Sequence, residues 1–171
     1  MKKLIALVLA LSVLSLFGCQ FSRPQNGQKP KGNYINEQVK SWEGGPTFKV
    51  VNVTEAEKYE GNYYNYIAKG KFIFVTIEIV NNGKNTFRSS AGDIWLIYNG
   101  EARIEQSDMT YYDNANWHNI EIVPTLQETH TAVFDVGKDV SIADLQVAIG
   151  DGALFNQQVA KINLTQRPTT D

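Results

Sequence analysis

The residues best suited to nucleophilic chemistry are one cysteine, Cys19, and two histidines, His118 and His130. A serine or cysteine hydrolase needs a nucleophile, a base beside it and a group that orients the base. His130 lies in the alternating stretch ETHTAVF, which is typical of a half-exposed strand. His118 follows Trp117 in a polar stretch, and no serine has the context of a nucleophile elbow. The sequence therefore predicts no enzyme. The alternative is an enzyme accessory or an undetected hydrolase, which would require His118 to meet an acid and a nucleophile in one cleft.

Metal ligands are also sparse in the sequence. Neither a His-x-x-x-His pair nor a contiguous EF-hand loop occurs. The oxygen-bearing side chains that could offer ligands to calcium are Asp108, Asp113, Asn114 and Asn116. Such residues more often make loops soluble and cap turns. We therefore expect no metal and no cofactor.

Aromatic side chains are the most suggestive candidates for binding. The stretch SDMTYYDNANWHN at 107–119 holds four candidate binding residues, Tyr111, Tyr112, Trp117 and His118. A second cluster in YEGNYYNYIAKG holds Tyr59, Tyr63, Tyr64 and Tyr66. Exposed aromatic rings beside polar side chains suit protein recognition or stacking on sugar rings. The alternative is that these rings cover the ends of a core or pair across strands.

The composition limits the possible partners. The chain has 171 residues and a net charge of −2, from sixteen basic and eighteen acidic residues. This length predicts one folded domain with extensions, and the balanced charge argues against nucleic acid as a partner. A lone cysteine excludes an internal disulfide, so stability must come from apolar packing.

The N-terminal segment has the layout of a secretory signal. Lys2 and Lys3 precede an apolar run from Leu4 to Phe17, which is short for a permanent membrane span. The end of this run, Leu-Phe-Gly-Cys at 16–19, resembles the lipobox of bacterial lipoproteins. The resemblance implies that residues 1–18 are removed and that Cys19 is acylated. It further implies a membrane anchor through the lipid on Cys19, on the extracytoplasmic side.

Residues 19–46 read as the lipidated cysteine and a flexible tether. The segment is rich in Gln, Asn, Lys, Gly and Pro, so it has little apolar area to offset the entropy of ordering. The exceptions are Tyr34, Ile35, Val39 and Trp42. These residues leave open a short helix or an early strand that packs on the domain.

Beyond Pro46 the pattern is that of β-strands at short intervals. The clearest strand, KFIFVTIEIV, has an aliphatic face made of Ile73, Val75, Ile77 and Ile79. TFKVVNV places Phe48 and Val50 on one face, continued by Asn52, with Val53 on the other. Asn81 to Gly83 predict a left-handed turn, and Asn99-Gly100 predicts a hairpin between 93–98 and 101–106. The fold class is all-β.

The strands also resemble a known family. KFIFVTIEIVNNGKNTF, DIWLIYNG, EIVPTLQETHTAVFDVGKDV and LQVAIGDG resemble the telokin-like immunoglobulin-fold domain of bacterial surface lipoproteins. That family is similar to a mycobacterial immunoprotective extracellular protein. The resemblance covers roughly Thr47 to Leu164, and it implies an immunoglobulin-like antiparallel β-sandwich without a recognised catalytic site.

Four regions are therefore predicted: a signal peptide at 1–18, a tether at 19–46, a β-sandwich at 47–166 and a C-terminal tail at 167–171. The predicted function is that of a non-catalytic, membrane-anchored lipoprotein whose loops bind an envelope or extracellular protein. A cell-wall glycan-binding module that uses the aromatic loop at 107–119 is the alternative binding function.

Overall fold

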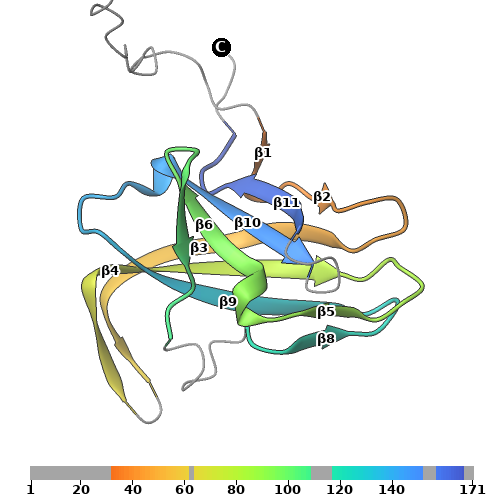
Figure 1. The fold of residues 1–171 in the computed structure, drawn as a ribbon, viewed down its shortest axis with the longest axis horizontal. Coiled ribbons are helices and arrows are strands. Elements are labelled where there is room, and N and C mark those ends of the chain that lie inside the picture. Colours follow the sequence, from red (N-terminus) through yellow and green to blue (C-terminus); the bar gives the residue numbers. More distant parts are fainter. Residues whose placement is uncertain (1–31, 62–63, 109–116, 152–156, 168–171) are drawn as a thin grey trace, which may run out of the picture.

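The computed structural model describes residues 32–61, 64–108, 117–151 and 157–167. Within these ranges the chain forms strands and two single-turn 3₁₀-helices, η1 (Ala91–Asp93) and η2 (Ile142–Asp144) (Figure 1). The strands are β1 (Asn33–Tyr34), β2 (Val39–Lys40), β3 (Thr47–Glu60), β4 (Asn65–Val80), β5 (Phe87–Ser89), β6 (Ile94–Tyr98), β7 (Ala102–Glu105), β8 (Ile120–Ile122), β9 (Gln127–Val136), β10 (Leu145–Asp151) and β11 (Gln157–Asn163). The predicted all-β class is confirmed.

Two main sheets pack face to face as a β-sandwich. One sheet has the strand order β1-β11-β10-β6-β7 and the other the order β2-β3-β4-β9, while β5 and β8 form a two-stranded sheet. Neighbouring strands are antiparallel except for β1, which runs parallel to β11. In the described residues no helix is long and apolar enough to cross a membrane.

The core follows the predicted alternation along β4. Its predicted aliphatic face is fully buried, at Ile73, Val75, Ile77 and Ile79. Across the sheet, β9 places Ala132 and Phe134 on the same side, and both are fully buried. Full burial of one such side chain contributes about 1.5–3 kcal/mol relative to its exposure, so this face of β4 and β9 holds the two sheets together.

A β-bulge changes the predicted alternation of β3. Val50 pairs with Ile77, but Asn52 pairs with Thr76, so Val51 is an extra residue in the ladder. After the bulge Val53 packs against the core, whereas Asn52 is exposed. The prediction that Asn52 continues the core face, with Val53 opposite, is therefore wrong, because one inserted residue reverses a period-two pattern.

The folded domain begins earlier than the predicted boundary at residue 47. β1 pairs with β11 and β2 pairs with β3, and these contacts bury Tyr34 and Val39. The prediction of a tether to residue 46 is wrong for this segment, because two apolar side chains and backbone pairing are enough to hold it on the sheets. At the other end, Arg167 pairs with Glu37, so this residue is not part of a free tail.

The two predicted turns differ in their outcome. Asn99 and Gly100 have φ values of 50° and 79°, and the Glu101 amide closes the turn on the Tyr98 carbonyl, as predicted for a hairpin. The turn after β4 does not need a left-handed backbone. Instead, the Gly83 amide donates to the Asn81 side-chain oxygen at 3.0 Å, which is an Asx turn.

Candidate functional site

Trp117 does not present its ring to solvent. It is fully buried, and its Nε1 donates to the Ser89 hydroxyl at 3.2 Å. An indole buried with its one polar group satisfied belongs to the core. The prediction of Trp117 as a surface binding residue is therefore wrong, and the alternative, that rings of this stretch cover the core, holds for it. Cys19, Tyr111 and Tyr112 lie outside the described residues.

The two histidines lie in different surroundings. His118 is exposed, and its Nε2 is 3.1 Å from the side-chain amide nitrogen, Nδ2, of Asn119. His130 is half-buried on β9, as the alternation predicted, with its Nε2 2.9 Å from a Glu128 oxygen. Its ring also packs against the ring of Trp117 in a T-shaped geometry, with 6.3 Å between the two ring centroids. No group of three or more His, Cys, Asp or Glu side chains suited to hold a metal ion occurs among the described residues.

The second aromatic cluster lies on an extension of two strands. β4 pairs with β9 only from Lys71 onward, so its earlier residues run past the end of β9 with only β3 beside them. Figure 1 shows this part of β3 and β4 bending away from the sandwich. We call it the hairpin arm, residues 57–61 and 64–70. Tyr59 pairs with Tyr66 across the arm.

Five aromatic rings run in a row from the tip of the arm onto the outer face of the sheet. Successive ring centroids are 5.7–6.3 Å apart in the order Tyr64, Tyr66, Tyr59, Phe74 and Phe72. Contacts of this kind contribute about 0.5–1.5 kcal/mol per pair beyond burial. Phe72 is buried at one end of the row, whereas Tyr64 is 62% exposed at the other. The row therefore couples an exposed ring to the body of the domain.

The base of the arm is fixed by one carboxylate on β9. Asp135 accepts hydrogen bonds from the amides of Lys69 at 3.0 Å and Gly70 at 3.4 Å. The backbones come so close here that a Cβ at Gly70 would lie 2.2 Å from the Val136 carbonyl oxygen. Glycine is thus required for this approach.

The arm exposes apolar side chains beside charged ones. Ile67 is 75% exposed and lies on the other face of β4 from Tyr66. The flanking residues Lys58, Glu60 and Lys69 are also exposed. Ile67 was missed by the sequence reasoning. The available signal was the alternation of Tyr64 and Tyr66 after Gly61, which is typical of a strand. Ile67, next to Tyr66 in that strand, would then be expected on the opposite face.

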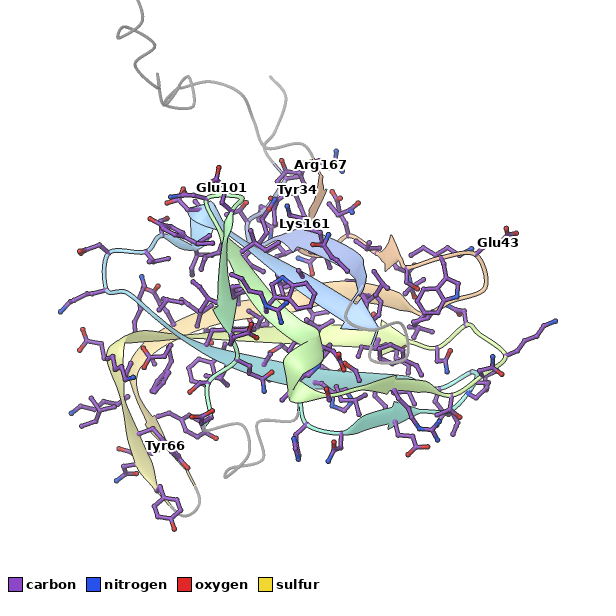
Figure 2. The ribbon with its side chains drawn as sticks, viewed as in Figure 1. Tyr34, Glu43, Tyr66, Glu101, Lys161 and Arg167 are labelled. Carbon is purple, nitrogen blue, oxygen red and sulfur yellow. The ribbon has the colours of Figure 1, made fainter. Side chains whose placement is uncertain are left out.

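On the opposite side of the domain, an ion pair joins the N-terminal and C-terminal segments of the folded domain. Arg167 donates to both carboxylate oxygens of Glu37 and lies over the ring of Tyr34 at 5.5 Å. The hydrogen bond from Arg167 lowers the pKa of Glu37 below its ordinary value, and Glu37 in turn raises the pKa of Arg167. In Figure 2, Tyr34 and Arg167 lie on the side opposite Tyr66, so the arm extends away from the point where the chain enters the domain.

Comparison with known proteins finds likeness in structure. No protein-family model matches the sequence, and no curated protein matches it. The YjhA protein from Bacillus subtilis has a TM-score of 0.61 at 12% identity, with 78% of this chain and 100% of that chain covered. The secreted protein MPT63 from Mycobacterium tuberculosis has a TM-score of 0.55 at 11% identity, with 80% of this chain and 99% of that chain covered. A conserved hypothetical protein from Bacillus anthracis has a TM-score of 0.51 at 13% identity, with 75% of this chain and 95% of that chain covered. At these identities the likeness concerns the fold alone, and the chain is an immunoglobulin-like β-sandwich similar in fold to YjhA and MPT63.

Proposed function

We propose that this chain is a lipid-anchored β-sandwich outside the cytoplasm that binds an envelope or extracellular protein through its hairpin arm, without a catalytic step. The observation that carries the proposal is the exposure of two large apolar side chains on the arm, Tyr64 at 62% and Ile67 at 75%. The aromatic row and Asp135 hold the arm in place. A side chain held in place before binding loses little conformational entropy when it meets a partner.

The chemistry of the tip favours a protein as the partner. Protein interfaces have an apolar or aromatic centre within a polar rim, and tyrosine is common among the residues that dominate affinity. Here Tyr64 and Ile67 are exposed apolar residues on opposite faces of the arm, and exposed lysine and glutamate side chains lie beside them. The arm, residues 57–61 and 64–70, carries Glu57, Lys58, Glu60 and Lys69, so its formal charges balance. Recognition would therefore rest on apolar contact rather than on long-range attraction.

The direction of the arm agrees with an anchor on Cys19. The chain enters the domain at β1, and the arm lies on the other side of the domain from β1 (Figure 1). A protein held by lipid near its N-terminus would thus present Tyr64 away from its own membrane. MPT63, which shares the fold, is described as a secreted protein. The lipobox-like residues at 16–19 support lipid attachment, because two acyl chains on one cysteine hold a protein stably on a bilayer.

The arm is tested by comparing partner capture between two variants of the full-length protein. Intact envelopes are cross-linked, and proteins bound to the wild-type chain are identified by mass spectrometry. We expect the double variant Tyr64→Ala, Ile67→Ala to reduce recovery of a specific protein at least tenfold, since losing two interface anchors costs about 2–4 kcal/mol. The matched control is Glu101→Ala, which changes an exposed turn residue on another side of the domain. Equal recovery by both variants would contradict the role of the arm.

The anchor is tested separately by Cys19→Ser. Without a thiol no diacylglyceryl group can be attached, so we expect the variant in the medium or the soluble fraction instead of the membrane fraction. Fractionation with immunodetection measures this change. Membrane retention equal to that of the wild type would refute lipid anchoring. Because this result says nothing about the arm, failure of the anchor and failure of the arm are told apart by the two experiments.

A further inference from the structure

A recess lies at the end of the sandwich away from the arm. It has a volume of about 240 Å³ and lies between the β2–β3 loop and the β4–β5 loop. Its lining includes the apolar residues Trp42, Pro46 and Phe87 and the polar residue Asn85. The labelled positions of Glu43 and Tyr66 in Figure 2 show that the β2–β3 loop and the arm are at opposite ends of the domain.

The loop holds the Trp42 ring in a fixed and partly exposed position. Gly45 donates its amide to the Trp42 carbonyl at 3.1 Å, and a Cβ at Gly45 would lie 2.5 Å from the indole ring. The Ser41 hydroxyl donates to the Pro46 carbonyl at 2.7 Å, which closes the loop. Trp42 remains 40% exposed. The result is a flat aromatic surface ordered before any ligand arrives.

A second recess shares the residue Arg88 with the first. It has a volume of about 410 Å³ and is lined mostly by polar side chains, among them Ser90, Asn119 and Glu121. Arg88 lines both recesses, and its guanidinium pairs with the Glu121 carboxylate. We call the two recesses together the end groove. Its lining includes an aromatic ring, two side-chain amides and an ion pair.

We propose that the end groove binds a carbohydrate chain, with one sugar ring stacked on Trp42 and the next sugars hydrogen-bonded along Asn85, Arg88 and Asn119. Sugar rings present an apolar C–H face to an indole and hydroxyl groups to planar polar side chains. An ion pair such as Arg88 with Glu121 offers donors and acceptors together without a net charge. The lining as a whole carries Lys84 and Arg88 against Asp93 and Glu121, so its formal charges balance and do not select a strongly ionic ligand. This inference does not depend on the arm, because no residue that lines the groove belongs to the arm.

The shape of the groove favours carbohydrate over a peptide. A peptide anchor of high affinity needs a deep apolar pocket that excludes water. Both recesses are open to solvent, and polar side chains are interspersed with apolar ones along them. A row of shallow polar contacts beside one ring suits a linear oligosaccharide.

Tryptophan fluorescence gives a direct test on the full-length protein in detergent. The chain has three tryptophans, of which Trp95 and Trp117 are buried and Trp42 is exposed, so iodide quenching reports mainly on Trp42. The probes are chitotetraose, cellotetraose and glycan strands released from purified peptidoglycan. We expect at least one probe to protect the protein from iodide quenching in a saturable manner.

Calorimetric titration of that probe then separates the groove from the rest of the molecule. We expect Trp42→Ala and Asn85→Ala each to weaken binding at least tenfold, and Trp42→Phe to retain part of the affinity because it keeps a ring. Glu101→Ala, which changes an exposed turn residue outside the lining of both recesses, is the matched control and should leave the affinity unchanged. No saturable protection by any probe, or the same affinity in Trp42→Ala and wild type, overturns the proposal. So does protection by a random peptide mixture but by none of the three sugars.

Discussion

Asn81 offers a sharp test of how the fold holds the end groove. Its side chain is 1% exposed, and its Nδ2 donates to the carbonyls of Ile122 at 2.7 Å and Asn85 at 2.9 Å. Its Oδ1 accepts from the Gly83 amide at 3.0 Å. Asn81→Ala removes all three bonds and leaves the buried Ile122 carbonyl without this donor. Each bond contributes about 0.5–1.5 kcal/mol, and an unsatisfied buried group costs about 1–3 kcal/mol, so we expect a loss of about 3 kcal/mol.

Urea denaturation of Asn81→Ala measures this loss, with the neighbouring Asn82→Ala as the control. Asn82 is exposed, and its amide makes longer bonds to Thr47 at 3.2 Å and to the Val80 carbonyl at 3.4 Å. We therefore expect its loss to stay below about 1 kcal/mol. Both variants should keep the wild-type dependence of unfolding free energy on urea. If the two variants differ by less than about 0.5 kcal/mol, the side chain of Asn81 does not tie the β4–β5 loop to β8 through the Ile122 carbonyl.

Three further predictions concern other parts of the domain. Asp135→Ala should speed hydrogen exchange of the arm amides about tenfold or more, with the core of β4 unchanged, because two bonds to a carboxylate are lost. Trp117→Ala should lower the free energy of unfolding by about 3–5 kcal/mol in denaturant titrations, since it empties a fully buried site and frees the Ser89 hydroxyl. Because its folded pKa is lowered, Glu37 adds stability above its unfolded pKa of about 4.3, and this is lost as pH falls through the folded value. Denaturation across this window should therefore show wild type and Glu37→Gln converging at low pH, and a constant difference would refute the pairing with Arg167.

The parts of the fold that sequence predicted well are those governed by local pattern. The aliphatic face of β4 is read from alternation alone, because every second residue of a strand shares a face. The hairpin at Asn99-Gly100 is predictable because few residue pairs accept positive φ at both positions. The immunoglobulin-like sandwich follows from many such strands at short spacing.

The parts that sequence did not predict depend on contacts between distant segments. The bulge at Val51 is invisible locally, since only pairing with β4 shows the extra residue. Burial of Trp117 depends on Ser89, far away in sequence, and its neighbours in the chain are polar. β1 and β2 have two residues each within a segment rich in polar residues, so only their pairing with β11 and β3 shows that they are ordered.

The candidate site divides in the same way. Tyr64 and Tyr66 were identified as an aromatic cluster, but the sequence did not show that their strands extend past the sheet. That result comes from the register of β4 against β9, which ends at Lys71. The role of Asp135 as the support of the arm likewise depends on a contact across the sheet.

The central claim is that the tip of the hairpin arm touches a partner protein outside the cytoplasm. A photoreactive amino acid placed at Tyr64 in the full-length protein, with illumination of intact cells, tests it most directly. We predict a specific adduct with one envelope or extracellular protein at this position, and none when the same group replaces the exposed Glu101 on another side of the domain. Adducts of the same identity and yield at both positions, or no adduct at Tyr64, would contradict the claim.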